Sequence, residues 1–242
     1  MTLQSIWFTL IFVLRIVTFG DQYKWIIHSI STAKYGISLD LQNVYVRKND
    51  DGIVFEVDLC HNSINIDKLK STYNLLNHIV LDLWSSHCSE AGEVLLLNSH
   101  FYNNWVDSGI TVSSYGVNSP FHIAFVNLTF QNAFRPLRIY DIPNITLQNI
   151  NITNCSGVIE HQNSNITYTG HNFIWNNDKA LYGIMFAWNS NVTFQGHTQF
   201  YDNTGFYAGV MYIQGSTITF DRNSITTFYH QPWEQWWGNG IV

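Results

Sequence analysis

The chain has 242 residues, of which 46% are hydrophobic and only 12% are charged, and its formal net charge is −6. This length is sufficient for one domain with a substantial core. Lysine and arginine together number only 11 and form no basic run, which argues against binding to nucleic acid or to an anionic membrane surface.

Residues 1–20 are typical of a secretory signal peptide. The apolar run Ile6–Leu14 is followed by small residues at the −3 and −1 positions of a cleavage site before Asp21. The alternative is an uncleaved membrane anchor, but the stretch contains Arg15 and is shorter than the ~20 apolar residues of a span. We therefore predict a secreted or cell-surface protein with no membrane span in its mature chain.

Residues 21–92 are strand-like but irregular. Apolar and polar residues alternate in part over 37–41 and 53–59, a pattern that predicts half-buried strands. No linker interrupts the chain after this region. We expect residues 21–92 to form an N-terminal cap and the first, irregular coils of a single domain.

Residues 93–242 contain an internal repeat. The segment 165–171 returns 26 residues later as 191–197, and again in eroded form as 217–223. A second marker, a glycine followed by two apolar residues, keeps the same spacing at Gly157, Gly183 and Gly209. Self-similarity at a fixed period of this length predicts one supersecondary unit stacked repeatedly on itself.

The repeat unit predicts strands rather than helices. Short apolar segments alternate with Asn and Gly, which tolerate the positive φ of a tight corner. Capped helical periodicity is absent from the sequence. Parallel crossovers are almost always right-handed. The sequence therefore predicts an all-β, right-handed parallel β-helix with about 26 residues per coil, and it leaves open whether the solenoid is truncated at its C-terminus.

Two short elements of the repeat resemble a known family. The segments Phe101–Asn104 and Phe200–Asn203 match a Phe-x-x-Asn element, and Gly183 and Gly209 match part of a Gly-apolar element. Together they are similar to the repeats of chlamydial polymorphic outer-membrane proteins, although the doubled glycine of that family is missing. This resemblance covers residues 94–228. It implies the β-helix fold and surface exposure and, more loosely, adhesion.

Three cysteines occur in the chain. Cys60 and Cys88 are 28 residues apart, which is close to one repeat. Equivalent positions on adjacent coils lie about 4.8 Å apart, within the range of a disulfide. The alternative is two buried thiols. We predict a Cys60–Cys88 bridge, with Cys155 left unpaired.

A catalytic function is the alternative from another class, because parallel β-helices include polysaccharide lyases and glycoside hydrolases of the pectin-lyase-like fold. Glycoside hydrolysis needs two carboxylates that face one bond, and a calcium-dependent lyase needs carboxylates stacked on one face. Asp178, Asp202 and Asp221 fall at three different offsets within the repeat. The sequence therefore favours a non-catalytic module that uses no cofactor.

His171 and His197 lie one repeat apart, and Asn223 occupies the same place in the third copy of the motif. Two stacked histidines are compatible with a metal ion or with a polar ladder. A metal site needs three or four convergent ligands, and no carboxylate or cysteine flanks the pair. We therefore predict a ladder column of His171, His197 and Asn223, without metal.

Trp175 and Tyr201 are expected to share a column on the outer surface. Each follows a residue that should face the core, Ile174 or Phe200, and side chains alternate along a strand. Stacked exposed aromatic rings suit a sugar or a partner protein. The alternative is ordinary surface aromatics. We predict a ligand platform here for glycans or extracellular proteins.

Asn-x-Ser/Thr sequons offer candidate N-glycosylation sites. In each sequon the apolar middle residue is expected to face inward and the asparagine outward. The six sites are Asn127, Asn144, Asn151, Asn154, Asn165 and Asn191. Asn165 and Asn191 should be stacked neighbours, too close for two bulky glycans.

Overall fold

The structure is a computed structural model. It describes residues 10–20, 25–29, 37–47, 53–58, 63–72, 79–84, 92–103, 109–115, 122–157, 159–178, 183–205 and 208–230. Every regular element among them is a β-strand, and this part of the chain contains no helix long and apolar enough to cross a membrane.

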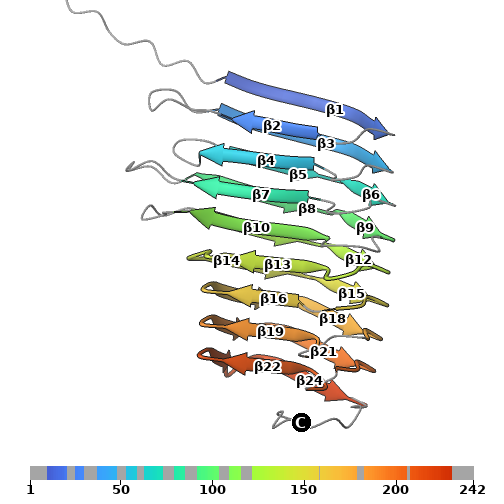
Figure 1. Cartoon of the computed structure of the whole chain (residues 1–242), viewed down its shortest axis with the longest axis vertical. Helices are drawn as coiled ribbons and strands as arrows, with labels where there is room; N and C mark the ends of the chain where they lie inside the picture. The colour runs from blue at the N-terminus through green and yellow to red at the C-terminus, as the bar shows by residue number, and fades with distance from the viewer. Residues whose placement is uncertain are drawn as a thin grey trace, which may run out of the picture.

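One wall of the molecule is an eight-stranded parallel sheet (Figure 1). Its strands are β2 (Trp25–Ser29), β4 (Ile53–Asp58), β7 (Ile79–Trp84), β10 (Ile110–Tyr115), β13 (Leu137–Tyr140), β16 (Ile159–Gln162), β19 (Met185–Trp188) and β22 (Met211–Gln214). Ile159 pairs with Met185, which pairs with Met211. The glycines at 157, 183 and 209 precede these paired residues by two positions, so the 26-residue spacing of the motif coincides with the strand register.

The remaining strands form a 16-stranded sheet made of two columns that are joined through β3 (Ile37–Arg47). The first column contains β5 (Ser63–Asp67), β8 (Glu93–Leu97), β11 (His122–Val126), β14 (Ile145–Gln148), β17 (Asn165–Thr169), β20 (Asn191–Phe194) and β23 (Thr217–Phe220). The second contains β6 (Lys70–Thr72), β9 (His100–Tyr102), β12 (Thr129–Gln131), β15 (Asn151–Thr153), β18 (His171–Trp175), β21 (His197–Tyr201) and β24 (Ile225–Tyr229). Each coil thus contributes three strands, and the predicted parallel β-helix is confirmed.

The coils differ in length although their strands stay in register. Stacked asparagines on neighbouring coils are 26 residues apart at Asn165 and Asn191, 22 apart at Asn127 and Asn149, and 29 apart at Asn98 and Asn127. The 26-residue period therefore belongs to the C-terminal coils. Residues are gained or lost at corners, where no strand pairing is disturbed.

Apolar side chains fill the interior in continuous columns along the solenoid. Inward and outward positions alternate within strands such as β5, β8 and β17. The rings of Tyr168 and Phe194 stack with centroids 5.0 Å apart, and Phe194 and Phe220 stack at 5.4 Å. Because each ring packs on its counterpart in the next coil, the core stabilises the stacking direction itself.

Asparagine occupies the corners, as predicted. Asn98, Asn127 and Asn149 have φ values of 49°, 57° and 55°, which asparagine tolerates better than most residues. The Asn127 amide donates to Asn98 Oδ1 at 2.8 Å and accepts from Asn149 Nδ2 at 2.8 Å. These amides form a hydrogen-bonded ladder that ties successive coils together at this corner.

The N-terminal part of the chain includes β1 (Leu10–Gly20), which pairs in parallel with β3. Strand β1 lies within the segment 1–20 that the sequence predicts to be a signal peptide. Cys60 and Cys88 lie outside the described residues. Cys155 is a free, buried cysteine, and burial raises the pKa of its thiol to about 12.

Candidate functional site

The outer face of β18, β21 and β24 is the candidate site. In β21 the side chains of Thr198 and Phe200 are buried, whereas those of His197, Gln199 and Tyr201 are exposed. The same alternation holds in β18, and the parallel register aligns the strands residue by residue. The period of two along each strand therefore produces outward columns that run parallel to the solenoid axis.

One of these columns is aromatic. Trp175 pairs with Tyr201, and Tyr201 pairs with Tyr229. Trp175, Tyr201 and Tyr229 are 38%, 37% and 58% exposed. The predicted outward orientation of Trp175 and Tyr201 is confirmed. We call Trp175, Tyr201 and Tyr229 the aromatic column.

Tyr229 was not identified from the sequence. The pair Phe228-Tyr229 copies Phe200-Tyr201 but lies 28 residues later rather than 26, so a fixed period misses it. Its inward neighbour Phe228 stacks on Phe200 with centroids 5.1 Å apart. The repeated Phe-Tyr dipeptide is the signal that could have revealed it.

The rings of Tyr201 and Tyr229 are nearly parallel, with an interplanar angle of 9° and centroids 5.0 Å apart. At this separation parallel rings are offset-stacked, so each tyrosine shares part of its face with the other. The accessible surface therefore combines ring edges with the uncovered parts of the faces. Such a ridge suits a ligand that lies across or along it.

The two predicted ladder histidines lie at the opposite end of β18 and β21 from the aromatic column, on the same outer face. His171 pairs with His197, and their ring centroids are 5.0 Å apart with an interplanar angle of 48°. The part of the chain that the structure describes holds no group of three or more His, Cys, Asp or Glu side chains that could bind a metal ion. The pair lies at the start of its strands, beside the corner.

The third member predicted for this ladder is wrong. The residue opposite His197 is Ile225, not Asn223. Asn223 lies in a turn, where its backbone N–H donates to Asp221 Oδ1 at 3.2 Å. Two additional residues in this corner shift the register after Phe220, so that the histidine column ends against an isoleucine.

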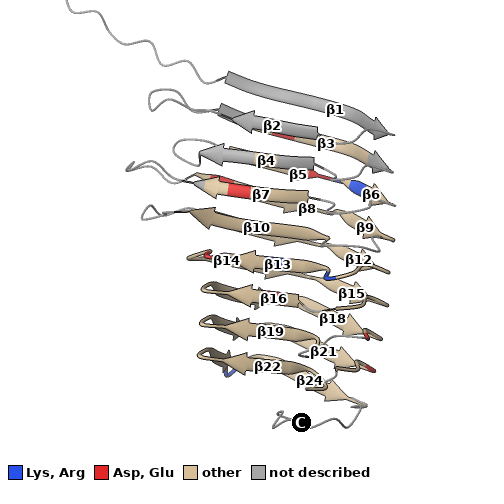
Figure 2. Ribbon diagram, in the orientation of Figure 1, with Lys and Arg blue, Asp and Glu red and all other residues tan. Residues whose placement is uncertain are grey.

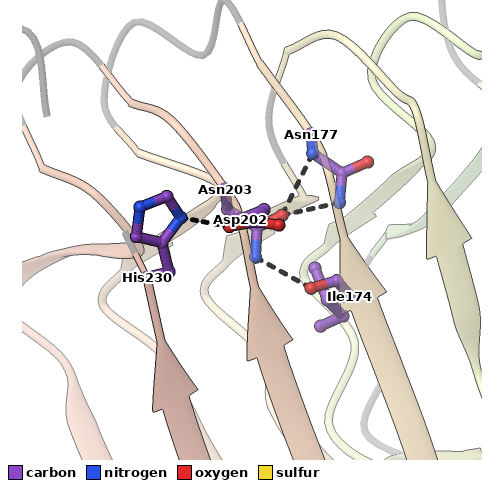
Figure 3. A network of polar contacts seen from close by, with 5 residues as sticks. All are labelled: Ile174, Asn177, Asp202, Asn203 and His230. Atoms are coloured by element: carbon purple, nitrogen blue, oxygen red, sulfur yellow. Dashed lines mark hydrogen bonds and ion pairs between the residues drawn. The ribbon is translucent and has the colours of Figure 1, made fainter. Parts of the chain in front are cut away.

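A hydrogen-bonded histidine–aspartate contact follows the aromatic column at the next corner. His230 Nδ1 contacts Asp202 Oδ1, and these two residues directly follow Tyr229 and Tyr201 (Figure 3). Charged side chains are otherwise sparse over the C-terminal coils (Figure 2). The aromatic column is therefore a largely neutral surface.

Buried amides hold these strands in register behind the outer face. Asn177 Nδ2 donates to Asn203 Oδ1 at 2.9 Å, and Asn203 Nδ2 donates to the Ile174 carbonyl at 2.8 Å (Figure 3). Asn177 and Asn203 are both almost fully buried. These hydrogen bonds fix β18 against β21, and so position Trp175 relative to Tyr201.

The other wall carries a compact ionic cluster. Arg138 Nε lies 2.7 Å from the Tyr140 hydroxyl and 3.4 Å from Glu160 Oε2. Burial, and then the charge of Glu160, raise the pKa of Tyr140 to about 12. The Glu160 carboxylate is paired with the Arg138 guanidinium. The cluster therefore contains one carboxylate, whereas glycoside hydrolysis uses two carboxylates that face the glycosidic bond.

The three carboxylates weighed for catalysis occupy different positions. The backbone of Asp178 forms an isolated β-bridge with that of Ser156. Asp202 contacts His230, and Asp221 lies in the corner turn before β24. Their separation in the fold matches their different offsets in the repeat.

A buried His–Tyr pair crosses the interior. His161 Nε2 lies 3.0 Å from the Tyr168 hydroxyl, and His161 Nδ1 has no hydrogen-bond partner among the described residues. Burial lowers the pKa of His161 to about 3 and raises the pKa of Tyr168. The sequence did not reveal this pair, because two residues seven apart meet only through the closure of the coil.

Comparison with known proteins identifies a family with this fold. A family model described as right handed beta helix region matches residues 85–241. No curated protein and no solved structure gave a significant match.

Proposed function

Because this chain belongs to the right-handed β-helix family, we propose that it is a secreted or cell-surface module that binds other molecules without catalysing a reaction. The ligand is an extracellular glycan or protein, and it contacts the outer face of β18, β21 and β24. The observation that carries the proposal is the aromatic column of Trp175, Tyr201 and Tyr229.

The column has the physical character of a binding surface. Aromatic rings bring large apolar area with few rotatable bonds, and they anchor many interfaces. Each of these three side chains is at least 37% exposed, although the ring of Phe173 lies beside Trp175 and that of His230 beside Tyr229. A largely neutral surface with polar neighbours such as Gln199 and Thr227 suits the hydroxyls and C–H groups of a sugar.

The proposed location rests on the leader-like segment 1–20. The similarity of the Phe-x-x-Asn elements to chlamydial polymorphic outer-membrane protein repeats supports surface exposure and, with it, adhesion. N-terminal sequencing of chain recovered from the medium tests this part. Cleavage before Asp21, which would remove β1 from its place beside β3, is the expected result.

A glycan array probed with the purified chain tests binding. Trp175→Ala is expected to weaken binding to any ligand found by about 1–3 kcal/mol, because it removes an anchor from the aromatic column. Trp188→Ala is the matched control, since Trp188 is 40% exposed but lies on the other sheet. Equal losses from both variants would contradict the assignment of the site.

Catalysis is the competing outcome of the same experiment. Incubation with pectin-like and other acidic or neutral polysaccharides, followed by assay for new reducing ends and unsaturated products, distinguishes the two functions. Turnover that survives Trp175→Ala but is lost in Glu160→Gln would assign function to the ionic cluster on the other wall instead.

A further inference from the structure

The six sequons differ in what their side-chain amides do. Three of them donate a hydrogen bond from Nδ2 to the neighbouring coil. Asn127 donates to Asn98 Oδ1 at 2.8 Å, and Asn165 donates to the Pro143 carbonyl at 2.8 Å. Asn191 donates to Asn165 Oδ1 at 2.9 Å. In these three the nitrogen that would carry a glycan is directed along the solenoid axis, into an inter-coil contact.

Asn144 and Asn154 are different. Asn144 is exposed in the corner between β13 and β14, and its side chain forms no hydrogen bond to another described residue. Asn154 is exposed as well; its Oδ1 accepts from Asn176 Nδ2 at 2.6 Å, while its own Nδ2 donates to no described residue. In both residues the amide nitrogen is available to solvent.

Asn151 resembles Asn127, Asn165 and Asn191 in that its side chain is not freely exposed, but for another reason. It lies in β15 and is only half exposed, and its Oδ1 is buried without a hydrogen-bond partner among the described residues. The burial of Oδ1 holds this carboxamide against the protein surface, in contrast to the exposed residues Asn144 and Asn154.

We propose that Asn144 and Asn154 are the N-glycosylated residues of the folded protein, and that Asn127, Asn151, Asn165 and Asn191 remain unmodified. This inference rests on the proposed secretory location. In the transfer, the asparagine Nδ2 forms a bond to the anomeric carbon of an oligosaccharide carried on a lipid diphosphate. The bond from that carbon to the diphosphate breaks, the lipid diphosphate leaves, and the amide loses one proton.

Coil spacing explains the selection. Adjacent coils lie about 4.8 Å apart, so a sugar attached to a nitrogen that points at the next coil has to displace that coil. Asn127, Asn165 and Asn191 already use one of the two N–H groups of Nδ2 toward the next coil, so a sugar on the same nitrogen is held against that coil and crowds the ladder. Attachment at Asn144 or Asn154 leaves every inter-coil hydrogen bond of the described ladders in place.

The test is site-by-site occupancy. The full chain is expressed in a eukaryotic secretory host, recovered from the medium, and treated with a peptide N-glycosidase in ¹⁸O water, which converts each occupied asparagine to labelled aspartate. Peptide mass spectrometry is expected to find label at Asn144 and Asn154 in most molecules and at the other four sequons in few. Asn144→Gln and Asn154→Gln should each remove one glycan from the secreted protein.

The possible failures are distinguishable. Secreted chain that is unlabelled, or labelled mainly at Asn127, Asn165 or Asn191, overturns this inference and leaves the proposed location intact. Chain that is unlabelled and confined to the cytosol refutes both. In unglycosylated bacterial protein, Asn127→Gln is expected to lower the melting temperature by several degrees and Asn144→Gln to leave it unchanged. Equal effects of the two substitutions would also overturn the inference.

Discussion

The two surfaces of the same three strands behave in opposite ways. On the inner side of β18, β21 and β24, Phe200 is 0% exposed and packs against Phe228 and Phe194. On the outer side, one residue further along, Tyr201 is 37% exposed and contacts mainly its own column neighbour. Both sides carry stacked aromatic rings at the same coil spacing.

The difference lies in what each stack does for the chain. The inner rings remove apolar surface from water and are held by packing from several strands. The outer rings stay in water on one side, so folding gains little from their aromatic character. We therefore expect the outer column to contribute less to stability than the inner stack, and this contrast is the reason for proposing a ligand site on the outer face.

The largest expected effect is a split between neighbouring residues. Phe200→Ala is expected to lower the free energy of unfolding by about 3–5 kcal/mol, because it leaves a cavity in the inner stack. Tyr201→Ala should cost less than about 1 kcal/mol, as for most surface changes. Urea denaturation of both variants measures the two values. Similar losses would show that the outer column is part of the structural core.

Acid should destabilise the inner side through His161. Its pKa is about 3 in the folded chain against 6.5 for a free histidine, so the unfolded chain binds a proton first. Stability is unaffected by this group above pH 6.5 and decreases progressively as the pH falls toward 3. The loss of unfolding free energy from His161 is about 3 kcal/mol at pH 4, relative to neutral pH. Unfolding free energies measured between pH 7 and pH 4 give this slope.

The control replaces both partners of the buried pair. His161→Leu with Tyr168→Phe removes the titrating group without leaving an unpaired hydroxyl, which is often nearly neutral for stability. The double variant should retain more stability at pH 4 than the natural chain does. An unchanged pH slope would assign the acid sensitivity to other groups.

Removal of a buried amide should have an intermediate effect. Asn177 accepts from the Cys155 backbone N–H at 2.8 Å and donates to the Ile152 carbonyl at 3.1 Å. Asn177→Ala leaves both groups without these partners, and is expected to cost about 1–3 kcal/mol. Gln199→Ala, on the exposed face of β21, should change stability by no more than about 0.5 kcal/mol. Thermal unfolding of both variants tests whether the buried amides hold the coils.

Much of this architecture could be predicted from local chemistry. Residues that repeat at a fixed period, such as Gly157 and Gly183, specify the stacking, and corner asparagines follow from the conformations that they tolerate. Inward and outward facing of Phe200 and Tyr201 follows from strand alternation. These features depend on residues close in sequence or at one constant spacing.

The features that the sequence did not predict depend on the length of individual corners and on how each coil closes. The displacement of Asn223 from the histidine column results from two added residues in one corner, which a period cannot anticipate. The His161–Tyr168 pair depends on closure of the coil, and the inward turn of Asn177 depends on Asn176 before it taking a φ of 51° at the corner. The repeated Asn-Asn and Asp-Asn pairs at 176–177 and 202–203 are the signal to look for.

The smallest expected effect concerns coupling within the aromatic column. Trp175 and Tyr201 are paired neighbours on one ridge, so a ligand that lies along the column contacts both. The double change to alanine should therefore weaken binding by about 0.5–1 kcal/mol less than the sum of the two single changes, because the second substitution acts on a surface already disrupted. Trp175→Ala combined with Trp188→Ala is the control and should be additive, since these residues lie on different sheets. Titration calorimetry of the natural chain, the three single variants and the two double variants with the ligand found on the array measures both cycles. Full additivity in the Trp175–Tyr201 cycle would mean that the two rings bind independently, and the ligand would then have to contact one coil rather than span two.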